Sequence, residues 1–161
     1  MYQKIMVPLD GSDLAECVMP HVEAIIAGSQ TKEVVLVRVV NPVRLPGSVP
    51  AQGDFGFTEK DRHRLNENRK KAAEEYLASK AQSLAVAGTD FRYALLEGSP
   101  AGQLADYATE NAVDLIIIAS HGRSGVSRWV MGSVAERLMR ISCVPVMMVR
   151  APGCEPKPRN G

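Results

Sequence analysis

The chain of 161 residues is long enough to bury the core of one domain without disulfides, and its 45% hydrophobic and 23% charged residues are typical of globular proteins. Its formal net charge of +1 offers no single-sign field for nucleic acid. No apolar run approaches the roughly 20 residues that span a bilayer, and the start lacks a signal-peptide pattern. Three scattered cysteines without a CxxC pair favour reduced thiols, so we expect a cytoplasmic protein without membrane contact.

Residues 3–9 are predicted to form the first strand, which ends at Pro8. A polar turn, residues 10–13, follows it. Open α/β sheets bind ligands at the carboxyl ends of their strands, so Asp10 is a candidate to contact a nucleoside or a phosphate-bound divalent metal. The alternative is a purely structural Asx turn with Ser12. We favour the binding role because of the position of Asp10 at the strand end.

A helix is predicted over residues 14–27, with Asp13 as its N-cap and Glu16 as the capping partner. Pro20 lies inside this range. Proline removes a backbone donor, so it either kinks the helix or marks a late start, and the sequence leaves both open.

A second apolar strand is predicted over residues 33–40, interrupted only by Arg38. Residues 41–57 contain three prolines and three glycines without periodicity, which is typical of a functional flap or a disordered loop. A long charged helix follows over residues 58–86, and its mixed charges indicate a solvated face and not a nucleic-acid surface. Its apolar stripe is predicted at Leu65, Ala72, Tyr76 and Leu84.

The second half of the chain alternates strands and helices. An edge strand is predicted over residues 91–96, a helix over 99–111 that Ser99 and Pro100 begin, and a fully buried strand over 115–119. After a loop, a helix and a strand over residues 144–149 complete the pattern. This alternation predicts an α/β fold, a doubly wound parallel sheet of five strands with helices on both faces. We expect one domain over residues 1–150 and a loose tail over 151–161.

The loop after the buried strand is rich in glycine and serine. Glycines allow phosphates to approach backbone N–H groups, and the start of the following helix adds unpaired donors and partial positive charge. Arg123 and Arg128 are available to offset phosphate charge. The alternative is a turn plus a capping box, because residues 133–136 have the pattern S-x-x-E. Neither a P-loop nor a G-x-G-x-x-G follows a strand, which argues against those two nucleotide sites.

The segment from Ala119 to Gly122, followed by nine residues and then Gly132-Ser133, resembles the nucleotide motif G-x2-G-x9-G-[ST] of the universal stress protein family. The opening KIMVPLDGS and the stretch SHGRSGVSRWVMGSVAERLMRISCVPVMMVR resemble the family as well. The similarity covers essentially the whole chain except the tail. It implies the strand order 3-2-1-4-5, binding of ATP or AMP in one branch of the family, and homodimers.

Transferred residue by residue, the resemblance assigns the nucleotide to both halves of the chain. Pro8 and Asp10 would lie near the adenosine, and Val39 would meet adenine through its backbone. The phosphates would contact Gly122, Gly132, Ser133 and the backbone of Val134, with Arg123 beside them. One position departs from the motif, because Ala119 replaces the first glycine near the ribose.

No catalytic residue is predicted. The unperturbed pKa of a histidine lies near neutrality, but a lone loop histidine such as His121, without a partner carboxylate, fits a structural or ligand-contact role better than that of a general base. The expected function is therefore a nucleotide-binding stress-response protein with slow or no ATP hydrolysis, with Mg²⁺ as a candidate companion of the phosphates. The alternatives are an ATP-independent dimeric scaffold and, by fold analogy alone, a slow ATP hydrolase or nucleotidyl-transfer enzyme.

A partner is predicted from the last strand. In the implied order this strand lies at an edge of the sheet, yet residues 144–149 are apolar on both faces. Soluble proteins usually protect such edges, and pairing with a second copy protects this one. We therefore predict a homodimer through residues 144–149.

Overall fold

The computed structural model describes residues 2–43, 58–84, 86–120 and 132–150. These residues form a five-stranded parallel sheet of order β3-β2-β1-β4-β5, as predicted. Because the order reverses between β1 and β4, the connections leave a crevice at the carboxyl ends of these two strands. The strands are β1 (Lys4–Pro8), β2 (Glu33–Val40), β3 (Asp90–Glu97), β4 (Leu115–Ala119) and β5 (Val146–Val149).

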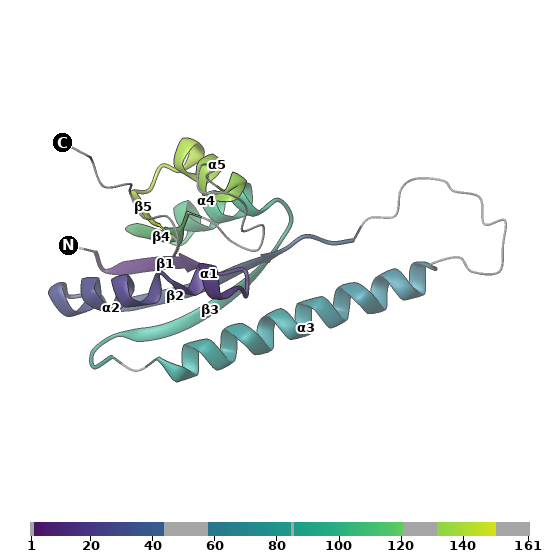
Figure 1. Ribbon diagram of the computed structural model, residues 1–161, viewed down its shortest axis with the longest axis horizontal. Helices are drawn as coiled ribbons and strands as arrows, with labels where there is room; N and C mark the ends of the chain where they lie inside the picture. Colours follow the sequence, from purple (N-terminus) through teal and green to yellow (C-terminus); the bar gives the residue numbers. More distant parts are fainter. Residues whose placement is uncertain (1, 44–57, 85, 121–131, 151–161) are drawn as a thin grey trace, which may run out of the picture.

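Helices cover both faces of the sheet (Figure 1). One face carries α1 (Asp13–Glu16), α2 (Met19–Gly28) and α3 (Glu59–Ser83). The opposite face carries α4 (Pro100–Glu110) and α5 (Ser133–Ile141). No helix in the described ranges combines the length and the apolar character needed to cross a membrane.

The two hydrophobic clusters divide the strand residues by alternation. In β4, for example, Ile117 packs under α1 and α2, whereas Ile116 and Ile118 face α4 and α5. Successive strand side chains point to opposite faces, so a strand with both faces covered is apolar throughout. All five residues of β4 are buried, which explains the continuous apolar run in its sequence.

The helix predicted over residues 14–27 is two helices. Pro20 lies in the first turn of α2, where its missing N–H is tolerated, so the late start is correct and the kink is wrong. The predicted cap is also wrong, because Ser12 caps α1 and Asp13 is the first helical residue. The Ala15 amide donates to the Ser12 hydroxyl at 3.2 Å, and the Glu16 side chain instead contacts α3.

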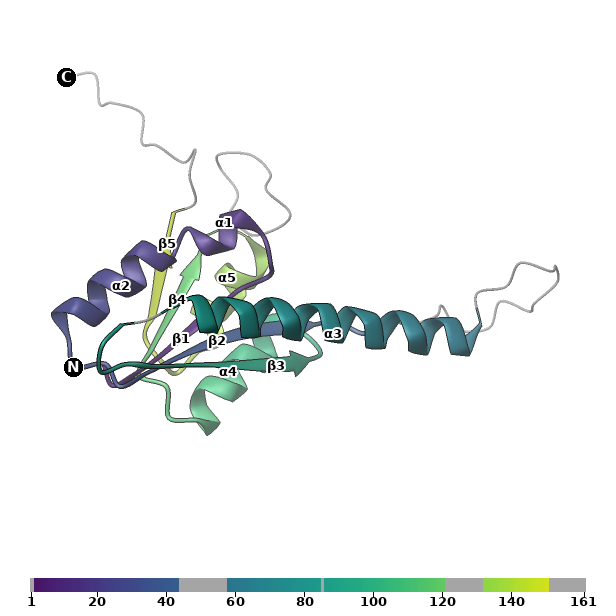
Figure 2. The ribbon, with the colours of Figure 1, turned by 90° about the horizontal axis from the view of Figure 1, so that it is seen from below.

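Only the C-terminal half of α3 is buried against the sheet. Ala73, Leu77 and Ala81 are its buried residues. Of the predicted stripe, Tyr76 and Leu84 pack against the core as expected, whereas Leu65, 39% exposed, and Ala72 do not. No residue from position 59 to position 72 is buried. This N-terminal half extends beyond the rest of the domain, as Figures 1 and 2 show. A capping box between Thr58 and Asp61 holds its first turn.

The last strand starts at Val146, two residues later than predicted. The backbone N–H of Val144 donates to the Ser142 hydroxyl at 3.0 Å, which forms a local turn and removes that donor from the ladder. Pro145 has no N–H, and its carbonyl accepts a bond from the Ile116 amide at 2.9 Å. This bond is the first of the ladder to β4, and the first paired residues are Ile116 and Val146.

Candidate functional site

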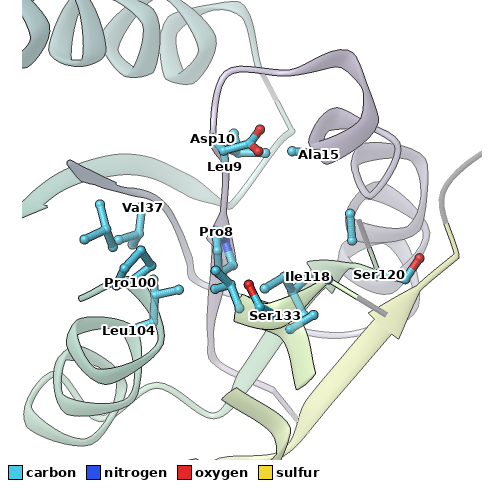
Figure 3. Close-up of a pocket in the computed structure, with 15 residues that line it drawn as sticks. Pro8, Leu9, Asp10, Ala15, Val37, Pro100, Leu104, Ile118, Ser120 and Ser133 are labelled. Atoms are coloured by element: carbon cyan, nitrogen blue, oxygen red, sulfur yellow. The ribbon is translucent and has the colours of Figure 1, made fainter. Parts of the chain in front are cut away.

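A cavity of about 270 Å³ lies at the carboxyl ends of β1, β2 and β4 (Figure 3). Ligand pockets for small molecules are roughly 300–1,000 Å³, so this volume lies near the lower limit of that range. The turn after β1, the end of β2, the start of α4 and the start of α5 surround it. Its lining residues are Pro8, Leu9, Asp10, Ala15, Val37, Val39, Pro100, Leu104, Ile118, Ala119, Ser120, Gly132, Ser133, Val134 and Ala135.

The structure gathers the predicted site residues that it describes around this one cavity. They come from three separate parts of the chain and are Pro8, Asp10, Val39, Ala119, Gly132, Ser133 and Val134. The parallel sheet brings them together because its strand ends share one edge. Two further predicted contacts, Gly122 and Arg123, lie outside the described residues, as do His121 and Arg128.

Asp10 is held by the turn that follows β1. The backbone N–H and the hydroxyl of Ser12 both donate to Asp10 Oδ1, at 2.9 and 2.6 Å. The Leu9 amide, just before it, donates to the Val37 carbonyl at 2.8 Å. The Asx turn weighed as an alternative is therefore present. It orients the carboxylate of a cavity-lining residue, so the turn and a ligand contact are compatible.

The start of α5 has an uncapped N-terminus. Gly132 is its N-cap, with φ −58° and ψ 135°, and no side chain caps it within the part of the chain that the structure describes. The predicted capping box is wrong, because Ser133 is already helical and Glu136 pairs with Arg140, one turn later. Gly132 is itself anchored, since its N–H donates to the Ser120 carbonyl at 2.8 Å. Such a helix start has amide donors and positive partial charge available for an anion.

Ala119 belongs to the regular ladder of β4, where it pairs with Val149. Its side chain is 6% exposed and packs in the cluster under α1 and α2. Among the described non-glycine residues, a positive φ is found at Ala112 and not at Ala119. The backbone of Ala119 is therefore in a conformation that does not require glycine. The departure from the glycine motif is therefore accommodated by the core on the α1 side of the sheet.

The wall opposite α5 is apolar. Val37 and Val39 of β2 and Pro100 and Leu104 of α4 line it together. Figure 3 shows Val37, Pro100 and Leu104 on the same side of the cavity. Of these residues, sequence reasoning assigned only Val39 to the site. Sequence reasoning identified Pro100 only as the start of a helix. The sheet topology places this helix start at the edge where the carboxyl ends of the strands lie.

The arrangement is suited to binding. It combines an apolar wall for a flat ring, one carboxylate for hydroxyl groups and a helix start for an anion. Asp10 is the only lining residue, within the described ranges, with an acidic or basic side chain. Those ranges also contain no cluster of three or more histidine, cysteine, aspartate or glutamate side chains arranged for a metal. The described walls therefore offer binding groups rather than an acid–base pair.

Comparison with known proteins gives one consistent result. The profile of the family described as Universal stress protein family matches residues 1–150. Universal stress protein MJ0531 of Methanocaldococcus jannaschii is 30% identical over 152 residues, which cover 94% of this chain and 84% of that protein. MJ0577 of the same organism is 28% identical over 156 residues, covering 93% and 96% of the two chains.

Solved structures share the fold. The structure of MJ0577 superposes with a TM-score of 0.76 at 24% identity, covering 95% of this chain and 99% of that one. Universal stress protein UspA from Lactobacillus plantarum superposes with a TM-score of 0.76 at 21% identity, covering 92% and 98%. The strand order and the crevice at its reversal therefore belong to a fold that these proteins share.

Proposed function

This chain belongs to the universal stress protein family, and from that membership and the geometry of the cavity we propose that it binds an adenine nucleotide, ATP or AMP. The observation that carries the proposal is the start of α5, which has no side-chain cap among the described residues and lines the same cavity as the Asp10 turn and an apolar wall. These three surfaces match the phosphate, the ribose and the base of a nucleotide in chemical type.

Structures of related proteins support the ligand class. One universal stress protein with this fold has been solved in complex with cAMP, with a TM-score of 0.56 to this chain. A family protein from Arabidopsis thaliana has been solved with AMP bound, with a TM-score of 0.60. In the proposed complex the base packs on Val39 and Pro100, the ribose hydroxyls donate to Asp10, and the phosphates accept bonds from the amides at Ser133 and Val134.

In this proposal Mg²⁺ arrives with the phosphates. Mg²⁺ is usually held by one or two carboxylates together with phosphate oxygens and water, and the described lining supplies Asp10. The protein should then have no measurable affinity for Mg²⁺ alone. We propose that nucleotide binding acts as a signal or a protective state, with slow hydrolysis at most. The described lining contains Asp10 but no second acidic or basic side chain that could work with it in acid–base catalysis.

Calorimetry tests the proposal. After removal of any copurified small molecule, the protein is titrated with ATP and with AMP, with and without Mg²⁺. We expect micromolar binding, and at least a tenfold loss in Gly132→Val, because the added side chain fills the space beside the helix start. The backbone angles of Gly132 suit any residue, so the variant should fold.

Gly28→Val is the matched control. Gly28 ends α2 far from the cavity lining, and an added Cβ there meets nothing within 4 Å. Its affinity should equal that of the unsubstituted protein. No heat at millimolar ATP and AMP would overturn nucleotide binding and favour the ATP-independent scaffold.

We further propose a homodimer through β5. This strand pairs with β4 on one side only, and Val146, Met147 and Met148 remain partly exposed along it. Met139 and Ile141 of α5 are 42% and 43% exposed. An apolar edge of this kind is usually covered by a partner strand. Light scattering should give a dimer at micromolar concentration and a monomer for Val146→Lys, whereas a monomeric unsubstituted protein would contradict the proposal.

A further inference from the structure

A cluster of four polar side chains joins α3 to the elements that carry the cavity. We call Glu16, Arg38, Tyr76 and Lys80 the Tyr76 cluster. The Tyr76 hydroxyl donates to Glu16 Oε1 at 2.7 Å, and Lys80 Nζ donates to Glu16 Oε2 at 2.5 Å. The Arg38 guanidinium carbon lies 5.4 Å from the centroid of the Tyr76 ring, within the range of a cation–π contact.

The charges in this cluster keep Tyr76 a neutral donor. Burial raises the pKa of Glu16, but hydrogen bonds from Lys80 and Tyr76 and the charge of Lys80 outweigh it, so the net pKa lies below 4.5. Burial, the bond to Glu16 and the charge of Glu16 raise the pKa of Tyr76 well above 10. The charge of Arg38 opposes this rise in the pKa, and the charge of Asp10 adds slightly to it.

The first connection from the cluster to the cavity runs through α1. Glu16 is the last residue of this four-residue helix, Ala15 lines the cavity, and Ser12 caps the helix while donating twice to Asp10. A single turn of helix has no stability of its own, since helix nucleation is unfavourable. The position of the Asp10 turn is therefore set by contacts from outside it, and the bonds to Glu16 are two of them.

The second connection runs through β2. Arg38 lies between Val37 and Val39, which both line the cavity. Successive strand side chains alternate, so Arg38 points to the α3 side of the sheet while its neighbours point to the cavity. One side chain of α3, Tyr76, thus contacts both the strand that forms the apolar wall and α1, the helix that directly follows the turn carrying Asp10.

From this juxtaposition we propose that Tyr76, assisted by Lys80, is a positioning residue for nucleotide binding. It fixes the turn after β1 relative to the end of β2, and so fixes the Asp10 carboxylate opposite the wall that receives the base. The inference rests on the proposed nucleotide function. It adds that α3 controls the geometry of the cavity although it contributes no residue to the lining within the described ranges.

The first test uses nucleotide-free protein. Tyr76→Phe removes the bond to Glu16 and keeps the ring over Arg38. Tyr93→Phe is the matched control, because Tyr93 is 41% exposed on β3 and outside the cluster. Hydrogen exchange of the amides of residues 10–16 should be faster in Tyr76→Phe than in the unsubstituted protein and in Tyr93→Phe. Equal exchange in all three proteins would overturn the proposal.

The second test measures affinity for ATP. Tyr76→Phe and Lys80→Met should each weaken binding, roughly threefold to tenfold for a coupled contact network. Lys71→Met is the control for Lys80, since Lys71 lies on the exposed half of α3 and should leave affinity unchanged. The loss caused by Tyr76→Phe should shrink in the Asp10→Asn background. An undiminished loss in that background would show that Tyr76 does not act through Asp10, and would overturn the proposal.

The two tests separate the two proposals. If the unsubstituted protein binds no nucleotide, the proposed function fails, and with it the binding role of Tyr76. The exchange measurement then still decides whether Tyr76 holds the turn. If the protein binds nucleotide and Tyr76→Phe changes neither exchange nor affinity, nucleotide binding stands and the positioning role alone is overturned.

Discussion

The helices of this protein begin in two different ways. The starts of α1 and α3 are closed by their own side chains: Ser12 accepts from the Ala15 amide, and Thr58 forms a capping box with Asp61. The starts of α4 and α5, at Ser99 and Gly132, carry no side-chain cap within the described residues. Both of these open starts contribute residues to the cavity. Of the closed starts, α1 contributes Ala15 and α3 contributes none that the structure describes, and α2, which follows α1 closely and also has no side-chain cap among the described residues, lies outside the lining.

The difference separates amides that stabilise the fold from amides available to a ligand. A capped helix start satisfies its donors internally, which contributes to stability and leaves little for a ligand. An open start keeps unpaired N–H groups, a cost that a bound anion removes. Serine next to a helix start is consistent with either arrangement, as Ser12 and Ser133 show. The following predictions test this division, from the largest effect to the smallest.

The largest effect is expected from a negative charge at the open start of α5. In Ser133→Glu, the carboxylate should stabilise the helix by about 0.3–1 kcal/mol through the helix dipole. The same charge should weaken ATP binding roughly a hundredfold by repelling the phosphates. Calorimetry and thermal unfolding measure the two effects.

Ser133→Gln is the control for this variant, because it has the same size without the charge. It should weaken ATP binding much less than Ser133→Glu does. Equal losses in the two variants would show that size, and not charge, matters at this position.

An opposite pattern is expected at the closed start of α3. Thr58→Ala removes the capping box and should lower the free energy of unfolding by about 1 kcal/mol. ATP affinity should not change, because this start lies outside the described cavity lining. Urea unfolding and calorimetry provide the two measurements. A change in ATP affinity would contradict the claim that capped helix starts contribute to stability and not to ligand binding.

A smaller effect is expected in the titration of Asp61. Hydrogen bonds from the Thr58 hydroxyl and backbone N–H hold the pKa of this carboxyl below its ordinary value of 3.8. Because the folded-state pKa is depressed, the box stabilises the folded protein above pH 3.8 and its contribution is lost as the pH falls through the folded-state pKa. NMR titration should place the Asp61 pKa below 3.8, and in Thr58→Ala it should rise toward 3.8. An unchanged value in that variant would contradict the assigned cause.

The last prediction concerns Ala119→Gly. The methyl group of Ala119 packs in the cluster under α1 and α2, so its removal should leave ATP affinity within about twofold. The free energy of unfolding should fall by about 0.5–1 kcal/mol, because glycine in a strand loses more conformational entropy on folding. A large gain in affinity would show instead that the methyl group hinders the nucleotide.

Most of the strands were predictable because they are short apolar runs, whereas β3 showed only partial alternation and the strand order followed from the family resemblance. The five residues of β4 could be assigned to a strand from their own sequence, because a strand that is buried on both faces is apolar at every position. The residues that meet in the cavity were predictable through the motif resemblance and the rule that ligands bind at strand ends. Asp10 and Gly132, far apart in sequence, followed from the two together.

The details that could not be predicted depend on tertiary contacts. Whether Ser133 caps α5 depends on where Gly132 is anchored, and that anchor is the carbonyl of Ser120 on another element. The buried stripe of α3 was missed because its three members include two alanines in a helix of mixed charge, so no hydrophobic period marks it. Nor does any local pattern indicate that Tyr76 meets Glu16, 60 positions earlier.

The uneven burial of α3 gives this helix the mechanics of a lever. Its buried residues begin at Ala73, and two polar contacts lie nearer its first residue: Lys70 pairs with Glu97 at 2.8 Å, and the Asn66 side chain accepts from the Val43 N–H at 2.9 Å. The arm beyond Asn66 spans seven residues, about 10 Å at 1.5 Å per residue, so a tilt of about 10° would move its tip by about 2 Å. The Tyr76 contacts lie in the packed half of the helix. Small changes at the cavity would therefore be magnified at the far end of α3, where a probe attached near Lys60 would register them.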